Sequence, residues 1–258
     1  GLFGDNTYAK GSATLTNVDI VDSVFYNGGR YYKQDSNYGK HISHFGMLAR
    51  EGTTITKSSV EGCYIYGGDH VTGLISGGRK QTNISYSFVT DTVICGTGGH
   101  SSGFISCNMA TGQGLSAQEV AQQTIVSNCF SNIELYGSKS IGGFNCVVDG
   151  YYTDCFSTGK IEGYDSIGGF VCQAANASIY TRCYSTALVG LRSDASTLGG
   201  FASKVMTYTG YQEDEGPWIT DCYAAGEVGN YTTNLNISQA ANNSKAGGFT
   251  AYTGPKAV

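Results

Sequence analysis

The chain has 258 residues, a formal net charge of −5 and only 14% charged residues. Its 38 glycines, 19 tyrosines and two prolines predict an all-β domain with many turns. The sequence contains no apolar run near the ~20 residues of a membrane span and no Lys/Arg-rich cluster, which argues against direct membrane insertion and nucleic-acid binding.

A glycine followed at once by a large apolar residue recurs seven times along the chain. The copies are Gly46-Met47, Gly73-Leu74, Gly103-Phe104, Gly143-Phe144, Gly169-Phe170, Gly200-Phe201 and Gly248-Phe249. Their spacing varies from 26 to 48 residues, as expected for a basic repeat that is lengthened by loop insertions. Repeats of this period are typical of architectures in which each unit buries its apolar face against its neighbours.

A second motif, a small or apolar residue followed by an aromatic ring, alternates with the first. Its copies are Val24-Phe25, Cys63-Tyr64, Ser87-Phe88, Cys129-Phe130, Cys155-Phe156, Cys183-Tyr184 and Cys222-Tyr223. Short strands that recur in each repeat without helical periodicity predict stacked parallel strands. We therefore predict one domain over residues 1–258, a right-handed parallel β-helix (β-solenoid) of about seven coils with loop insertions. The chain begins at Gly1 without an initiator methionine, so we expect it to be part of a larger polypeptide with neighbouring domains.

Alternation along the strands predicts which side chains face the core. Cys155, Ser157 and Ile161 share one face, whereas Phe156, Lys160 and Glu162 share the other, which we expect to be the outer face because it carries charge. The phenylalanines of the glycine motif are predicted to line the core. The glycines before them predict a corner where the backbone bends or is crowded by the adjacent coil.

The two motifs together resemble those of the GLUG repeat family. The copy most similar to the family pattern runs from Asp154 to Gly159 and continues at Gly168-Gly169-Phe170-Val171. The chain departs from the pattern in having phenylalanine where the family has leucine, and usually Cys, Ser or Ala where it has the final glycine. The resemblance implies a bacterial extracellular or cell-surface protein, in adhesin-like surroundings, and a β-solenoid stalk or binding surface.

The nine cysteines follow the repeat and do not form local pairs. We expect them to be buried free thiols, because stacked parallel neighbours orient their Cβ atoms poorly for a disulfide. One inward ladder is predicted for Cys129, Cys155, Cys183 and Cys222, with Cys63 in the same column. The sequence has no Cys-x-x-Cys pair that would indicate zinc, and we expect no cofactor.

Two histidines occupy equivalent positions, three residues before a motif glycine. His70 and His100 could stack on adjacent coils, and a bound metal is conceivable. The same column holds Ser140, Ser166 and Thr197 elsewhere, however, which favours an ordinary exposed polar position over a metal site.

The aromatic residues of the second motif are the main candidate for ligand binding. Seven residues, Phe25, Tyr64, Phe88, Phe130, Phe156, Tyr184 and Tyr223, are predicted to form one outward column. Such a stripe beside polar groups would suit a glycan or a host surface protein. The alternative is that the rings stack on one another and only stabilise the solenoid.

The insertions are the second candidate for ligand binding. The stretch from Tyr208 to Trp218 combines Tyr211, three acidic residues and the only tryptophan. It could bind a glycan or calcium, although its acidic residues lack EF-hand spacing and a solvated turn fits them better. The ligand-binding hypothesis thus rests on Tyr64, Phe130, Phe156, Tyr184, Tyr223, Tyr211 and Trp218.

No catalytic constellation emerges from the sequence. The Asp and Glu residues are scattered and do not recur in one column, and there is no His-Glu-x-x-His, Gly-x-Ser-x-Gly or phosphate-binding loop. We therefore expect a surface binding module and not an enzyme. A passive stalk that displays a neighbouring domain remains an alternative, and a polysaccharide-degrading β-helix enzyme is a less favoured one.

Overall fold

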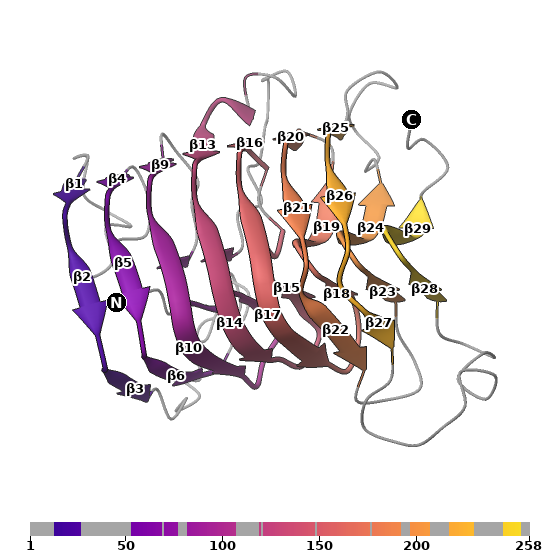
Figure 1. Ribbon diagram of the computed structural model, residues 1–258, viewed down its shortest axis with the longest axis horizontal. Helices are drawn as coiled ribbons and strands as arrows, with labels where there is room; N and C mark the ends of the chain where they lie inside the picture. The colour runs from indigo at the N-terminus through magenta and orange to yellow at the C-terminus, as the bar shows by residue number, and fades with distance from the viewer. Residues whose placement is uncertain are drawn as a thin grey trace, which may run out of the picture.

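The structure, a computed structural model, describes residues 13–26, 53–68, 70–76, 82–106, 119, 121–147, 149–175, 177–191, 197–206, 217–229 and 245–253. This part of the chain is all-β with almost no helix, and every strand pairing in it is parallel. Figure 1 shows the strands side by side, in chain order from one end of the molecule to the other.

The first sheet, sheet A, takes its strands from points spread along the whole chain. In spatial order it contains β1 (Ala13–Thr16), β4 (Thr53–Thr56), β9 (Thr82–Ser85), β13 (Thr124–Ser127), β16 (Tyr151–Thr153), β20 (Ile179–Thr181) and β25 (Trp218–Thr220).

Sheet B has the same spatial order and is the largest. Its main path is β2 (Asp19–Val21), β5 (Ser59–Glu61), β10 (Phe88–Gly96), β14 (Phe130–Tyr136), β17 (Phe156–Gly163), β21 (Tyr184–Ser185) and β26 (Tyr223–Ala224). Four further strands extend it, namely β3 (Val24–Tyr26), β6 (Tyr64–Gly67), β22 (Leu188–Leu191) and β27 (Val228–Gly229).

The remaining strands form sheet C and two short groups that we call sheet D. Sheet C contains β7 (Val71–Thr72), β11 (His100–Ser102), β15 (Ser140–Gly142), β18 (Ile167–Gly168), β23 (Thr197–Gly199) and β28 (Lys245–Gly247). Sheet D contains β8 (Ile75–Ser76) and β12 (Ile105–Ser106), then β19 (Val171–Ala175), β24 (Ala202–Met206) and β29 (Thr250–Thr253). Asn145 bridges to both Ile105 and Val171 and so links the two groups.

Consecutive strands contribute to sheets A, B, C and D in turn, and we call each such set a rung. Rung 1 is β1–β3, rung 2 is β4–β8, rung 3 is β9–β12, rung 4 is β13–β15 with Asn145, rung 5 is β16–β19, rung 6 is β20–β24 and rung 7 is β25–β29. The prediction of an all-β protein with stacked parallel strands is confirmed.

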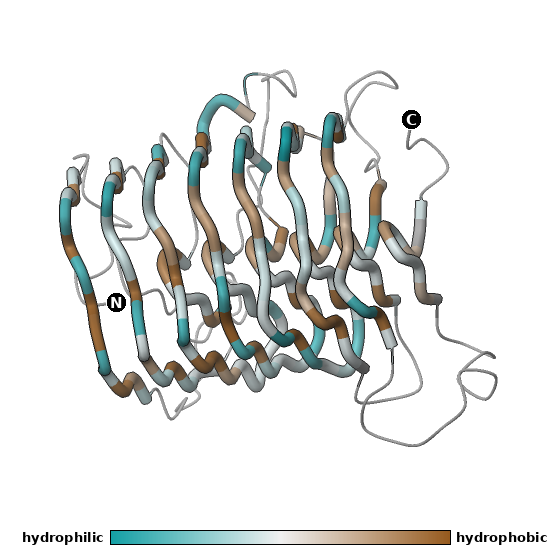
Figure 2. Tube along the Cα trace, in the orientation of Figure 1, coloured by the Kyte–Doolittle hydropathy of each residue, from teal (hydrophilic) through white to brown (hydrophobic). Residues whose placement is uncertain are grey.

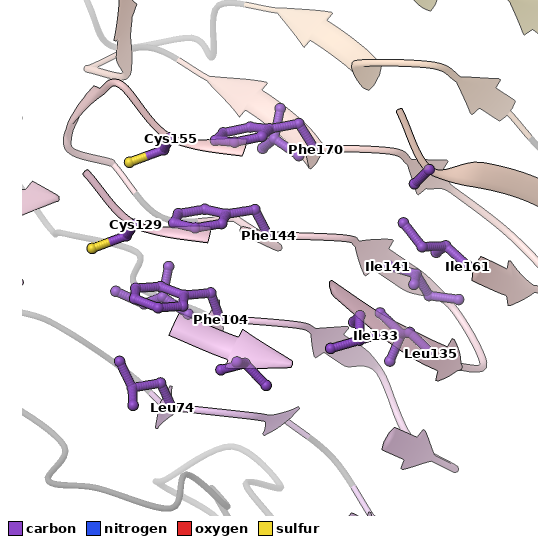
Figure 3. Packing of buried hydrophobic residues seen from close by; sticks show 14 of the residues in the cluster. Leu74, Phe104, Cys129, Ile133, Leu135, Ile141, Phe144, Cys155, Ile161 and Phe170 are labelled. Carbon is purple, nitrogen blue, oxygen red and sulfur yellow. The ribbon is translucent and has the colours of Figure 1, made fainter. Parts of the chain in front are cut away.

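The phenylalanines of the glycine motif form a stacked column in the core, which we call the inner ladder. Rings of Phe104, Phe144, Phe170, Phe201 and Phe249 follow one another with centroids 4.5 to 5.0 Å apart. The first four are completely buried, and Leu74 continues the column in rung 2, as Figure 3 shows. Their predicted inward orientation is confirmed.

Two buried tyrosines of sheet A pack against the inner ladder. Tyr152 and Tyr180 stack on each other with centroids 5.1 Å apart, and Tyr152 meets Phe144 edge-on at 6.3 Å. Edge-to-face contacts between two stacked columns are favourable, because the positive ring edge of one side chain faces the negative ring face of another.

The thiol column is also inward, as predicted, but its membership differs. Cys129, Cys155 and Cys183 are buried, and Cys222 is partly exposed. The predicted place of Cys63 in this column is wrong. Its backbone N–H donates to Thr92 Oγ1 over 3.3 Å, whereas Ser58 occupies the equivalent of Cys129 in rung 2.

The physical reason is a second bend in the early rungs. The chain passes through left-handed conformations at Asp22, Gly62 and Asp91, with φ of 47°, 61° and 49°. In this part of sheet B in the later rungs, Gly159 of rung 5 has a positive φ, of 97°. The pairing of β10 with β14 has a register shift between Thr90 and Thr92, because Asp91 of rung 3 has no partner in rung 4. The second bend is thus present in rung 3 and absent from rung 4. In rung 2 the small-then-aromatic pair Cys63-Tyr64 follows the second bend, whereas Ser58-Ser59 follows the first, so the sequence pattern alone aligns the wrong bend.

Buried and more exposed residues alternate along β14 of sheet B. Figure 2 shows hydrophobic and hydrophilic residues interspersed along the strands. Glu162 is an exception to the predicted pattern. It was expected on the exposed face, yet only 4% of its surface is accessible. Its carboxylate lies 2.7 Å from Lys160 Nζ, which compensates its charge.

The paired glycines stand where two backbones meet. A Cβ on Gly142 would lie against the carbonyl oxygen of Asn145, three residues along the same chain. A Cβ on Gly143 would lie against the carbonyl oxygen of Gly169 in the next rung, and one on Gly169 against that of Gly200. The corner therefore needs the first glycine for its bend and the second for the approach of the neighbouring rung.

Candidate functional site

Sheet A turns into sheet B at a corner that repeats in every rung. Asn128, Asp154, Arg182 and Asp221 are the corner residues of rungs 4 to 7, and each adopts a left-handed conformation with φ between 51° and 54°. Asn and Asp tolerate this conformation better than most residues. The residue after each corner residue points inward, and the next one is the aromatic residue of the second motif.

The corner residues of rungs 5 and 6 form an exposed ion pair. Arg182 donates through Nε to Asp154 Oδ1 over 2.7 Å and through Nη2 to Oδ2 over 2.8 Å. The hydrogen bonds from the guanidinium lower the pKa of Asp154. Because both side chains are exposed, the pair contributes little stability. It does present a polar group of fixed geometry to solvent.

Five outward rings of sheet B form a second stack, which we call the outer ladder. Phe88, Phe130, Phe156, Tyr184 and Tyr223 follow one another with centroids 4.8 to 4.9 Å apart and interplanar angles of 3° to 4°. Each inner member has both ring faces covered by its neighbours. Only ring edges are offered to solvent along most of the ladder, and among the described residues no ring covers the outer face of Tyr223.

Two of the seven predicted members do not belong to this ladder. Tyr64 pairs with Val24 and Val93, and Phe25 pairs with Ile65, whereas the ladder position in rungs 1 and 2 is held by Asp19 and Ser59. Phe25 and Tyr64 follow the second bend of their rungs, whereas the members of the outer ladder follow the first corner. Tyr64 is 41% exposed, and its hydroxyl lies 3.7 Å from Cys95 Sγ.

Sheet A presents a second apolar column, which sequence analysis missed. Ile125, Tyr151, Ile179 and Trp218 are register partners on its outer face, and all but Ile179 are among the exposed large hydrophobic residues. Trp218 was expected at the end of an insertion loop, but it lies within β25 and is 39% exposed. Tyr211, the other predicted residue of that insertion, lies outside the described residues.

A polar strip separates the sheet A column from the outer ladder. It consists of the hydroxyl residues Ser127, Thr153, Thr181 and Thr220 together with the corner residues. In rung 7 the strip consists of Thr220 and Asp221, which are exposed and lie between Trp218 and Tyr223. We call these four residues the rung 7 cluster. Two exposed rings beside hydroxyl and carboxylate groups can contact a sugar or a peptide.

The thiols next to this surface have little chemical reactivity. Burial raises the pKa of Cys155. The pKa of Cys183 is raised chiefly by its contact with the Cys155 thiol, and that of Cys222 chiefly by its contact with Cys183. Since the thiolate is the nucleophile, these side chains behave as small apolar groups at neutral pH. The eight cysteines within the described residues are free.

The two histidines stack as predicted, with ring centroids 4.8 Å apart and an interplanar angle of 19°. The expectation of an exposed position is wrong for His70, which is buried. His100 Nδ1 lies 3.4 Å from Cys146 Sγ. Within the described ranges, no group of three or more His, Cys, Asp or Glu side chains is placed to hold a metal ion.

One half-buried carboxylate escaped the sequence analysis. Burial raises the pKa of Asp149 to about 7, although hydrogen bonds with the Ala177 backbone and the Ser178 side chain oppose the shift. The single sequence signal is an acidic residue between an apolar pair and Gly150, directly before a strand. Burial raises the pKa of the Tyr152 and Tyr180 phenols, and the nearby Asp149 carboxylate adds to both shifts.

No protein-family model, curated protein or solved structure matches this chain. In the described part, no helix combines the length and apolar character that a bilayer crossing requires.

Proposed function

We propose that the chain is a right-handed parallel β-helix of the GLUG-repeat type that serves as a bacterial cell-surface or secreted adhesion module. Its partner would be a glycan or a host surface protein, and it would act within a larger polypeptide. The repeated motifs support the family, and strands that visit four sheets in turn support the β-helix. Right-handedness rests on the strong general preference of parallel crossovers.

The observation that carries the binding proposal is the rung 7 cluster. Rings inside the outer ladder cannot stack against a ligand, because their faces are already in contact with other rings. Tyr223, which is 51% exposed, and Trp218 are the aromatic residues at the end of their columns. Thr220 and Asp221 lie between them and would accept or donate hydrogen bonds to sugar hydroxyls or peptide groups.

We expect a glycan array, followed by titration calorimetry of the hits, to reveal a ligand that depends on this cluster. Tyr223→Ala and Trp218→Ala should each weaken binding at least about tenfold, since removal of a central aromatic contact costs about 1–2 kcal/mol or more. Tyr164→Ala is the matched control, because Tyr164 is 49% exposed but belongs to neither column, and it should bind as the wild type does.

The same experiment separates binding from the alternative role of a passive stalk. The outer ladder favours that alternative, because most of its ring faces are stacked against neighbouring rings and are not available to a ligand. If no glycan or host protein binds the folded wild type, or if every hit survives both substitutions, the rung 7 cluster is not a binding site.

A further inference from the structure

The core is incompletely covered at rung 7. Tyr180, Cys183 and Phe201 of rung 6 are fully buried, whereas their register partners Ile219, Cys222 and Phe249 are only partly buried. These three residues line a cavity of about 440 Å³, together with Val205, Asp221, Thr250 and Thr253. The lining is largely apolar and is left exposed at rung 7, whereas rungs 2 to 6 bury the equivalent surface.

The strands around the cavity also have unused backbone groups. Among the described residues, β25 pairs only with β20, β26 only with β21 and β27 only with β22. A parallel edge strand presents a row of N–H and C=O groups, which is a template for one more parallel strand. A segment that pairs with this edge and inserts apolar side chains into the cavity would complete the backbone hydrogen bonds and cover the exposed apolar surface.

The opposite end of the same chain carries a segment with these properties. In rung 1, Leu15 and Val18 are only partly buried although they pack against the core. Within the described residues, β1 pairs only with β4 and β2 only with β5, so these strands too have a free edge. Through the register of sheet A, Leu15 occupies the column of Ile219 and Asn17 that of Asp221.

We infer that rung 7 binds rung 1 of a second copy of this chain, head to tail, with β1 paired to β25 and β2 to β26. Leu15 and Val18 of the second copy would cover Ile219 and Cys222. Asn17 shares the left-handed corner conformation of Asp221, with φ of 55° and 54°, so the backbones match at the bend. Its amide would donate to the Asp221 carboxylate, as the Arg182 guanidinium of rung 6 does to the Asp154 carboxylate of rung 5.

The contact joins different surfaces of the two copies, so it does not close on itself. Each added copy presents a new rung 7, and the expected product is a linear series of oligomers and not a symmetric dimer. The contact would occupy Asp221 and the free face of Tyr223, so it would compete with ligand binding at the rung 7 cluster. Its evidence is separate, because it rests on the strand edges and the uncovered core, and sedimentation tests it without any glycan.

Two end-blocking variants test the contact by sedimentation velocity. Lysine on an edge strand disfavours pairing, so Leu15→Lys should block rung 1 and Ile219→Lys should block rung 7. The wild type should form dimers and larger species as concentration rises, and each variant alone should stay monomeric. An equimolar mixture of the two should form a dimer and nothing larger, because one intact rung 7 and one intact rung 1 remain in the mixture.

Controls separate the contact from loss of folding. Ile125→Lys places the same charge on the outer face of sheet A, away from both edges, and should associate as the wild type does. Ala224→Lys, on β26, replaces Ile219→Lys if the latter loses cooperative unfolding. A wild type that stays monomeric at all concentrations, or a variant mixture that forms no dimer, would overturn the inference.

Discussion

At the scale of single residues, a neighbouring cation decides the state of a carboxyl group more than its exposed fraction does. Glu162 is almost completely buried yet stays paired with Lys160, whereas Asp149 has no cation among the causes of its pKa shift. Burial therefore favours the protonated form of Asp149 in the folded chain. The carboxyl group costs folding free energy once it is ionised, even though it accepts hydrogen bonds.

Asp149 makes stability depend on pH in a defined direction. Its pKa rises from an ordinary value of 3.8 to about 7 on folding, so its contribution is fully present below pH 4 and is lost as pH rises through 7. We expect the difference in melting temperature, Asp149→Asn minus wild type, to be larger at pH 8 than at pH 4. A change of the order of 1 kcal/mol would correspond to about 2–4 °C.

Ser178→Ala should increase the pH dependence that Asp149→Asn removes, and thermal melts at the same pH values measure it. Because the Ser178 hydrogen bond stabilises the carboxylate, its removal should steepen the loss of stability with pH. Equal pH profiles for Asp149→Asn and wild type would show that Asp149 is not the group responsible.

At the scale of elements, the paired-glycine corner and the outer ladder hold neighbouring rungs in register. The corner brings the backbones of successive rungs so close that a methyl group at Gly143 has no space. The ladder aligns rings at the spacing of the strands themselves, so that backbone hydrogen bonding and ring stacking favour the same register.

The corner predicts a large effect of one methyl group. Gly143→Ala should destabilise the protein by about 1–3 kcal/mol or more, because the Cβ would overlap the Gly169 carbonyl of the next rung. Gly229→Ala is the matched control, since no heavy atom lies within 4 Å of a Cβ built there, and it should change stability by less than about 0.5 kcal/mol. Urea denaturation measures both, and equal midpoints would contradict the crowded corner.

At the scale of the whole molecule, the described strands of each rung pair with strands of the rungs before and after it. Inner rungs are covered on both sides, whereas the described strands of rungs 1 and 7 pair on one side only. Stability in such arrays is close to a sum of rung terms and interface terms, so the ends are expected to open first.

Hydrogen exchange followed by mass spectrometry tests this gradient. Amides of β14 and β17 should exchange at least about tenfold more slowly than those of β2 and β26. The Leu15→Lys variant at low concentration is the proper sample, because head-to-tail association would protect both ends of the wild type. Uniform protection along the rungs would show that the molecule opens as a single cooperative unit.

The sequence by itself determined the repeat, the parallel strands and the inward face. Cys155 and Phe170 recur at equivalent positions of successive repeats. Because side chains alternate strictly along a strand, these positions all face the same side, which is the core. Tertiary structure alone decided the alignment of the early rungs. Two similar bends compete in each of these rungs, and only strand pairing selects Ser59, and not Tyr64, as the partner of Phe88.

The same distinction applies to the candidate site. The ring-bearing positions were predictable, since Phe156, Tyr184 and Tyr223 follow equivalent residues. Which ring has a free face was not predictable, because stacking brings together rings 28 and 39 residues apart in the chain, Phe156 with Tyr184 and Tyr184 with Tyr223. The place of Trp218 beside Ile179 and the raised pKa of Asp149 likewise arise from neighbours distant in sequence, and no local pattern encodes them.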